Sequence, residues 1–222
     1  MTFENIFFVI FLWFFFGFQH SFLAQKIVKD FIRKICGENF LIFGYRFFYF
    51  VTQCIVFPVF WHLISIIEPG KQIWEIPENY LSTIFILNIF SQYLLLFSVL
   101  LVDVNHFIGT KQLFWYIKCK IGNKELPNEK EVKKTNLNIN YLFKIVRHPM
   151  YLGIILVFLT SSAIFTEKSV LNLLCLIIYI EIGIFFEERQ LVREYKNEYV
   201  EYQKTVPKIN PFFYIVKMFY RN

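Results

Sequence analysis

The chain has 222 residues, of which 56% are hydrophobic and 30 are Phe. Soluble domains use apolar residues at about half of their positions and contain fewer aromatic ones, so this composition excludes an ordinary soluble domain and indicates a membrane protein. The formal net charge of +6 does not indicate a nucleic-acid partner, because the basic residues lie in loops between apolar segments. Membrane lipid is the expected surrounding.

Five apolar stretches approach the length that crosses a membrane as a helix, roughly 20 residues. They are residues 5–24, 40–67, 80–102, 151–165 and 170–186. The first lacks a preceding basic segment and a small-residue cleavage site, so we interpret it as a retained span and not as a signal peptide. The predicted fold is an all-α integral membrane protein of about five transmembrane helices, in one domain over residues 1–222.

The shorter segments are predicted to connect or flank these spans. Residues 107–116 are too few and too aromatic to span, and indicate a turn plus an interfacial helix. Residues 118–140 are rich in Lys and Asn and are typical of a mobile cytoplasmic loop, and residues 166–169 predict a hairpin between two antiparallel helices. After the fifth span, one amphipathic helix is predicted from apolar residues at helical spacing. These residues are Leu191, Tyr195, Tyr199, Tyr202 and Val206. The helix should stop at Pro207, before an apolar tail from Pro211.

The positive charges predict an orientation. Of the 23 Lys and Arg residues, 21 follow the first, third or fifth span, and only Lys71 and Lys168 lie in the other loops. Because cytoplasmic loops carry the excess of Lys and Arg, the N-terminus is expected outside and residues 187–222 in the cytoplasm. The absence of targeting features favours a prokaryotic inner membrane. The four cysteines are scattered without a C-x-x-C pair, which indicates free thiols, no disulfide framework and no cysteine metal site.

Polar residues gather at the cytoplasmic ends of the predicted spans, where ionisable groups are functional candidates. They are Gln19, His20, Ser21, Asp103, His106, Arg147, His148, Glu187 and Glu188. Some of these residues, and Glu181 deeper in the fifth span, also fit structural roles. His20 fits a helix end at the interface, Asp103 and His106 fit a helix C-terminus with its following turn, and Glu181 fits a partner for Arg46 or a tyrosine.

The segment 145–153 is the most informative of these. Pro149 fits the first turn of the fourth helix, and Arg147 and His148 then precede a helix N-terminus whose free N–H groups suit an anion such as a carboxylate. Glu187 and Glu188 end the fifth span and oppose the helix dipole there. Arg147, a cationic or hydroxyl-rich ligand, or solvent must therefore compensate them.

The motif Arg147-His148-Pro149-x-Tyr151-x-Gly153, then a helical hairpin, Glu187-Glu188 and Tyr199-x-x-Tyr202-x-x-x-Val206-Pro207, resembles the C-terminal half of the isoprenylcysteine carboxyl methyltransferase and phospholipid methyltransferase superfamily. In the N-terminal half, residues 18–24 and the motif Asp103-x-x-His106-Phe107-x-Gly109 with Gln112 look like the methanethiol S-methyltransferase and NnrU-like subgroup.

This resemblance implies S-adenosylmethionine bound at the cytoplasmic face by the last two spans and the C-terminal helix. The cofactor-binding residues that it implies are Arg147, His148, Tyr151, Gly153, Glu187, Glu188, Tyr199 and Pro207. Arg147 would lie near the cofactor carboxylate, one of the two glutamates would bind the ribose hydroxyls or the amino group, and Tyr199 and Pro207 would shape a lid.

The implied catalytic residues on the substrate side are His20, Asp103 and His106. Because a thiolate is the nucleophile and a free thiol is mostly protonated at pH 7, a neutral His20 or His106 is a candidate proton acceptor.

Three functions stay open at this point. The first is methyl transfer to a small, methanethiol-like thiol, and the second is methyl transfer to an isoprenylcysteine carboxylate or another lipophilic acceptor. The third is a non-catalytic membrane subunit that binds haem or a metal through His20, His106 and His148. The sequence predicts neither the oligomeric state nor a protein partner.

Overall fold

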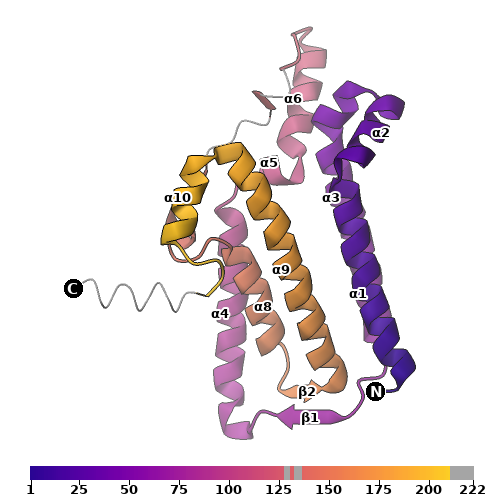
Figure 1. Cartoon of the computed structure of the whole chain (residues 1–222), viewed down its shortest axis with the longest axis vertical. Helices are drawn as coiled ribbons and strands as arrows, with labels where there is room; N and C mark the ends of the chain where they lie inside the picture. The colour runs from indigo at the N-terminus through magenta and orange to yellow at the C-terminus, as the bar shows by residue number, and fades with distance from the viewer. Residues whose placement is uncertain (128–130, 133–136, 211–222) are drawn as a thin grey trace, which may run out of the picture. The chain divides into compact units, whose positions relative to one another are not determined.

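The computed structural model describes residues 1–127, 131–132 and 137–210, and within these residues almost all regular structure is helical (Figure 1). Among the described residues, four helical segments are long and apolar enough to cross a membrane. They are Phe3–Ala24, Phe40–Ser65, Glu78–Leu100 and Glu167–Tyr195. The predicted all-α integral membrane fold is therefore confirmed. The predicted tail from Pro211 and part of the predicted 118–140 loop lie outside the described residues.

The elements follow one another in chain order. They are α1 (Phe3–Ala24), α2 (Lys26–Cys36), the π-helical η1 (Phe40–Gly44), α3 (Tyr45–Ser65), β1 (Gln72–Glu75), the 3₁₀ segment η2 (Glu78–Tyr80), α4 (Leu81–Leu100), α5 (Val104–Ile108), α6 (Thr110–Ile121), η3 (Tyr141–Lys144), α8 (Pro149–Thr160), β2 (Ile164–Thr166), α9 (Glu167–Tyr195) and α10 (Asn197–Thr205). The turn and helix predicted over 107–116 correspond to α5 and α6.

The fourth predicted span, 151–165, differs in the structure. It corresponds to α8, an apolar helix of 12 residues. At 1.5 Å per residue such a helix is about 18 Å long, less than the roughly 30 Å of a hydrocarbon core. The helix stops because residues of the same apolar run form β2, which pairs antiparallel with β1 and places Trp74 opposite Phe165.

The hairpin predicted over 166–169 is a strand end followed by a helix start. Thr166 closes β2 and also caps α9, since its side chain accepts a hydrogen bond from the Ser169 backbone N–H. The Ser169 hydroxyl and the Thr166 backbone N–H complete a reciprocal capping box.

The chain divides into two compact units, each described here by itself. The first unit contains Met1–Ile6, Pro69–Val102 and the described residues from Leu137 onward. Its centre is the packing of α8 on α4, with α9 on the other side of α8 (Figure 1). The Asn88 amide donates a hydrogen bond of 3.1 Å to the Thr160 hydroxyl across the α4–α8 interface. Polar pairs between helices hold them together in lipid, where no hydrophobic force between helices operates.

One end of the first unit ties three distant segments together. The amino group of Met1 contacts the Glu167 carboxylate, and the Lys71 backbone N–H donates to the same carboxylate at 3.0 Å. The chain N-terminus, the start of β1 and the start of α9 therefore meet at this end.

The second unit contains Phe7–Glu68 and the described residues from Asp103 to Val132. In it α1 and α3 pack antiparallel, with the Trp13 and Phe60 ring centroids 5.1 Å apart. The Tyr49 hydroxyl donates a hydrogen bond of 3.2 Å to the His20 carbonyl, which ties the end of α1 to α3.

Gly109 joins α5 to α6 in the second unit and lies in the left-handed region at φ +96°. A Cβ at this position would lie 2.6 Å from the Phe47 backbone nitrogen, so α3 leaves no room for a side chain. The glycine of the predicted motif is therefore required for the close approach of this turn to α3.

The predicted C-terminal helix is two helices. α9 continues nine residues beyond the predicted span and ends at Tyr195, and Lys196 adopts φ +51° before α10 begins. The chain turns at this residue, so α10 folds back beside α9 (Figure 1). The predicted stripe is packed: Tyr199, Tyr202 and Val206 form a buried cluster. α10 ends before Pro207, as predicted.

Candidate functional site

The candidate site forms where the segment before α8 lies against the segment after α10. The Arg147 backbone N–H donates to the Pro207 carbonyl at 2.9 Å, and the His148 N–H donates to the Lys208 carbonyl at 3.1 Å. Pro149 then occupies the first turn of α8, where its missing N–H costs nothing. His148 is consequently held at the helix N-terminus with only 5% of its surface exposed.

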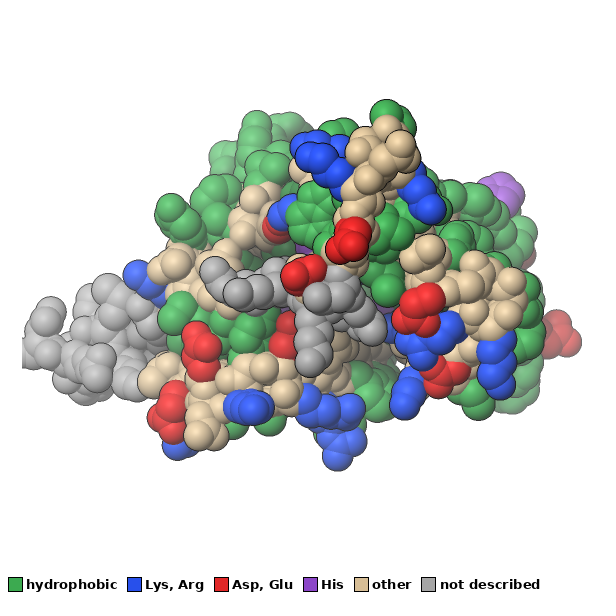
Figure 2. Space-filling view, turned by 90° about the horizontal axis from the view of Figure 1, so that it is seen from above, with side chains coloured by type: hydrophobic (Ala, Val, Ile, Leu, Met, Phe, Trp, Pro, Cys, Tyr) green, Lys and Arg blue, Asp and Glu red, His purple; other side chains and the backbone are tan. Residues whose placement is uncertain are grey.

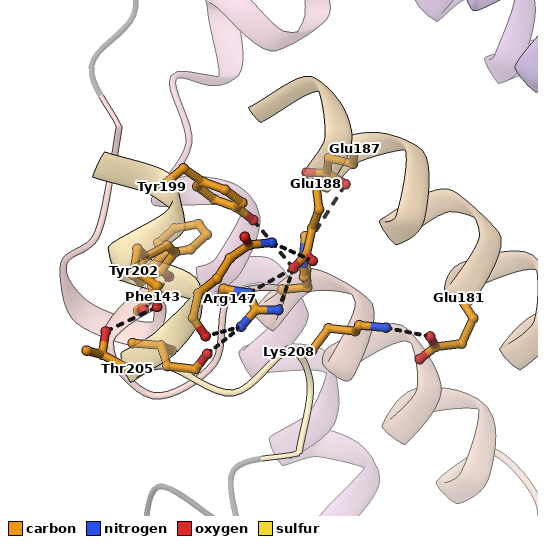
Figure 3. A network of polar contacts seen from close by, with 12 residues as sticks. Phe143, Arg147, Glu181, Glu187, Glu188, Tyr199, Tyr202, Thr205 and Lys208 are labelled. Carbon is orange, nitrogen blue, oxygen red and sulfur yellow. Dashed lines mark hydrogen bonds and ion pairs between the residues drawn. The ribbon is translucent and has the colours of Figure 1, made fainter. Parts of the chain in front are cut away.

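Arg147 and Glu188 form the centre of the site (Figure 3). The guanidinium Nε and Nη2 lie 2.8 and 2.7 Å from Glu188 Oε1, and the two side chains are 9% and 15% exposed. Nη1 donates to the backbone carbonyls of Gln203 and Val206. Arg147 is therefore the group that compensates Glu188 at the α9 end, one of the alternatives predicted, and it also fixes the end of α10.

Glu188 accepts further hydrogen bonds. His148 Nε2 lies 3.0 Å from Oε1, the Tyr199 hydroxyl lies 3.5 Å from the same atom, and the Gln203 amide donates to Oε2 at 2.9 Å. Both oxygens of this carboxylate are thus engaged by protein groups. Glu188 holds α8, α9 and α10 together.

Glu187, its neighbour in sequence, is placed differently. Its Oε2 accepts a hydrogen bond of 2.9 Å from the Tyr151 hydroxyl and lies 3.9 Å from His148 Nδ1. Its side chain is 44% exposed. A carboxylate has about four acceptor positions, so Glu187 keeps capacity for a ligand that Glu188 does not.

The two tyrosines of α10 stay protonated. Burial raises the pKa of the Tyr199 and Tyr202 phenols well above the ordinary 10.0, and the Glu188 charge raises both further. The Tyr202 hydroxyl donates a hydrogen bond to the Phe143 carbonyl, which joins α10 to η3. These phenols act as hydrogen-bond donors and not as bases.

The other predicted cofactor residues are also found in the first unit. Pro207 contributes its backbone carbonyl, and Gly153 is buried where α8 crosses α4. A Cβ on Gly153 would lie 2.9 Å from Leu95 Cα. The structure thus gives Gly153 a helix-packing role, which the motif alone did not indicate.

The predicted substrate-side residues lie in the second unit. Asp103 caps α5 by accepting a hydrogen bond of 3.0 Å from the His106 N–H, and it pairs with Lys111 at 2.8 Å. The Lys111 hydrogen bond holds the pKa of Asp103 below its usual range. The His106 carbonyl accepts from Arg46, and the His20 ring lies against Phe16 and Tyr49.

Arg46 and Tyr49 are three residues apart on α3, so they lie on one side of the helix. Because they bind the His106 and His20 carbonyls, α3 carries both histidine-bearing segments on neighbouring turns.

The sequence did not predict three contacts of the candidate site: two made by Gln203 and one made by Glu181. Gln203 contacts both Arg147 and Glu188, and a polar residue four positions after Tyr199 on the same face was the available signal. Glu181 pairs with Lys208 at 2.8 Å and not with Arg46 or a tyrosine, so that prediction is wrong. The Lys208 contact follows from the turn after α10, and no local pattern indicates it.

These observations define an integral membrane protein with a charged site assembled from the ends of α8, α9 and α10. No family model and no solved structure matches the chain. The chain is similar to the methanethiol S-methyltransferase of Crocosphaera subtropica, with 28% identity over 89% of this chain and 71% of the relative. It is also similar to methanethiol S-methyltransferase 1 of Bradyrhizobium diazoefficiens, with 27% identity over 88% of this chain and 63% of the relative. The enzyme of the same name from Pseudomonas deceptionensis is 28% identical over 88% of this chain and 69% of its own length.

These relatives confirm the resemblance to the methanethiol S-methyltransferases, which belong to the isoprenylcysteine carboxyl methyltransferase-like family. The likeness extends over both structural units and is not confined to the C-terminal motif. The chain spans between 63% and 71% of the length of these three relatives.

Proposed function

We propose that this protein transfers a methyl group from S-adenosylmethionine to a small, methanethiol-like thiol at the cytoplasmic face of the membrane. The observation that carries the proposal is the coincidence of two findings. The chain is similar along 88–89% of its length to enzymes named for thiol methylation, and α8, α9 and α10 bring the implied cofactor residues together around Glu187 and Glu188.

The residues fit such a cofactor. S-adenosylmethionine carries a cationic sulfonium, an ammonium and ribose hydroxyls, and all of these groups suit a carboxylate with free acceptor positions. Glu187 is that carboxylate, since its side chain is 44% exposed and only Oε2 has a hydrogen-bond partner within the described residues. The Tyr151 hydroxyl orients it. Glu187 is therefore assigned to the cofactor, and Glu188 to holding the site in shape.

Arg147 has a different role from the one implied by the resemblance. Its guanidinium already binds Glu188 and two backbone carbonyls. Arg147 therefore positions α10 at the site, and its N–H groups are not available to bind the cofactor carboxylate. The N–H groups that begin α8 beside His148 suit the cofactor carboxylate instead.

S-adenosylmethionine, when bound, supplies a methyl group on a positively charged sulfur. Transfer to sulfur needs no acid to assist the leaving group, so the task of the protein is to hold a thiolate in line with that methyl group and away from water. The protein groups around Glu188 contribute by fixing the geometry. The Arg147–Glu188 pair and the tyrosines of α10 immobilise the helix ends that carry Glu187 and His148.

The other functions predicted from the sequence have less support. The names of the relatives point to a thiol and not to a lipid carboxylate. Across residues 1–127, 131–132 and 137–210, no three His, Cys, Asp or Glu side chains are grouped so as to hold a metal ion. The interpretation as a metal-binding subunit therefore has no three-ligand site among these residues to support it.

Calorimetric titration of the detergent-purified protein with S-adenosylmethionine tests the cofactor. Wild type should bind saturably, and both His148→Ala and Glu187→Gln should weaken binding. The matched control is Glu201→Gln, an exposed acid of α10 whose side chain pairs with Lys204 and which should leave binding unchanged. A wild type that neither binds nor is thermally stabilised would overturn the proposal. Conversion of added methanethiol to its methyl sulfide then tests the acceptor.

A further inference from the structure

The amide of Gln112 fixes the state of the His106 ring. Gln112 is 3% exposed, and its Nε2 lies 3.1 Å from His106 Nδ1 and 3.1 Å from the His106 backbone oxygen. Both contacts lie within the second unit, between α5 and α6.

These two contacts determine which ring nitrogen carries the proton. A backbone carbonyl only accepts hydrogen bonds, so the Gln112 atom that contacts it is the amide nitrogen, a donor. The same nitrogen faces Nδ1, which must therefore accept. In a neutral imidazole one nitrogen accepts and the other carries the hydrogen, so the hydrogen of neutral His106 lies on Nε2.

Burial and the neighbouring positive charges favour the neutral form of the His106 ring. Burial lowers the pKa of His106 below its ordinary 6.5, and the positive charges of Arg46 on α3 and Lys111 on α6 lower it further. Asp103, which caps α5, acts in the opposite direction and does not outweigh them.

Two groups here lack a partner within the part of the chain that the structure describes. No residue there hydrogen-bonds to His106 Nε2, which presents an N–H. Gln112 Oε1 is buried without a donor. The N–H of the ring is therefore open to a ligand that accepts a hydrogen bond, such as an anion, whereas the amide oxygen would need a donor.

We propose that His106 binds the thiolate form of the substrate through its Nε2–H, and that Gln112 is the positioning residue that holds this tautomer. This inference rests on the proposed function, because the thiolate is the anion that function requires. It also decides between two roles for His106. Since Nδ1 is engaged by Gln112 and Nε2 already bears hydrogen, His106 is a donor and not the base. The thiol proton is lost to solvent before the sulfur binds.

The tautomer is tested without any activity measurement, by the ¹⁵N chemical shifts of the four histidines in the full-length protein, with His106 assigned by its loss in His106→Asn. We expect a neutral ring protonated at Nε2, and a mixture of tautomers in Gln112→Leu. Addition of methanethiol above the pKa of its thiol should move the His106 Nε2–H signal. A ring protonated at Nδ1, or no response to methanethiol, would overturn the inference.

The catalytic role is tested by the pH dependence of kcat/KM for methanethiol. Because the thiolate forms in solution, the acid limb belongs to free methanethiol and should stay in place in both variants. His106→Asn keeps an N–H donor and should retain the wild-type kcat/KM, whereas His106→Leu should lower kcat/KM about tenfold at every pH. If His106 were the base, both variants would lose activity, and the limb that belongs to the His106 ring would disappear in both. The control is His62→Gln at the opposite end of α3, which should match wild type.

The two proposals fail in different ways. A wild type that binds no S-adenosylmethionine and methylates no thiol would sink the proposed function, while the histidine spectra would still report the tautomer and its response to a thiolate. A wild type that methylates methanethiol with a ring protonated at Nδ1 would sink the inference alone.

Discussion

Glu187 and Glu188 are adjacent in sequence and are held in opposite environments. Glu188 is enclosed, with Arg147, His148 and Gln203 on its two oxygens, while Glu187 contacts Tyr151 and is 44% exposed. Consecutive helix residues point about 100° apart, so only one of the two can face the segment between α8 and α10. This difference supports the proposed roles, in which Glu188 holds the site in shape and Glu187 binds the cofactor.

This division predicts unequal effects on stability. Glu188→Gln leaves Arg147 without its counter-charge in a poorly exposed position, and removing one partner of a buried pair costs about 3 kcal/mol. Glu187→Gln removes a partly exposed charge and should cost under about 1 kcal/mol. Thermal unfolding in detergent should show a large fall in the midpoint for Glu188→Gln only. Equal shifts would contradict the assignment.

Gly153 gives a second comparison at the scale of single residues. Gly153→Ala would place a methyl group against the Leu95 backbone of α4, and such overpacking costs about 1–3 kcal/mol. Gly183→Ala is the control, because a Cβ there meets nothing within 4 Å and Ala is the better helix former by up to about 1 kcal/mol. The unfolding midpoint should fall for Gly153→Ala and stay or rise for Gly183→Ala. Similar midpoints in both would show that α8 does not pack closely on α4.

The sequence indicated the charged residues of the first unit well but not their partners. Arg147, His148 and Glu188 could be found because a charge at a membrane edge needs a reason, and a motif placed them at helix ends. Gln203 and the Phe143 carbonyl could not, because their contacts depend on how α10 folds back. Backbone carbonyls carry no sequence signal at all.

Among the elements, the long helices were predictable and their ends were not. Apolar runs predict where a helix crosses lipid: α1 and α9 each contain a predicted span, and α3 and α4 each form most of one. Hydropathy does not tell a helix from a strand in a short apolar run, so β2 was included in the fourth span. The break at Lys196 was also hidden, because a lysine at φ +51° is imposed by the packing of α10 and not by local preference.

α2 is an amphipathic helix with a row of exposed apolar side chains and several basic residues. Ile27, Phe31 and Ile35 recur every four residues and are 73%, 60% and 65% exposed. Lys26 and Lys34 are among the basic residues of the helix. α2 begins directly after α1, at the end of a predicted membrane span. A helix with one apolar and one basic face lies in the headgroup region. We therefore expect the apolar face of α2 to contact lipid.

Tryptophan fluorescence in nanodiscs tests this position of α2. Phe31→Trp should add emission that brominated lipid quenches, relative to the four native tryptophans. Lys29→Trp, on the opposite face, should add emission that is quenched far less. Equal quenching of the two would show that α2 does not lie flat in the interface.

On the scale of the whole molecule, the two-stranded pair constrains how the chain is threaded. β1 follows α3 and β2 follows α8, and their pairing brings both connections to one end of the first unit, together with Met1 and the start of α9. α8 must therefore return the chain along α4 despite its 12 residues. The site at His148 consequently lies at the other end of α8 from the strands. Acidic and basic side chains are visible on the molecular face shown in Figure 2.

The threading and the distribution of Lys and Arg together predict which end faces the cytoplasm. The segments joined by β1 and β2 contain only Lys71 and Lys168, so this end should lie outside. Lys71→Cys should then react with a membrane-impermeant maleimide in intact cells. Wild type should not react, because Cys36 and Cys119 follow the first and third spans and Cys54 and Cys175 lie within α3 and α9. Lys204→Cys, on α10, should react only after permeabilisation. Reaction of Lys204→Cys but not of Lys71→Cys in intact cells would invert the orientation and place the methyl-transfer site outside, where S-adenosylmethionine is not made.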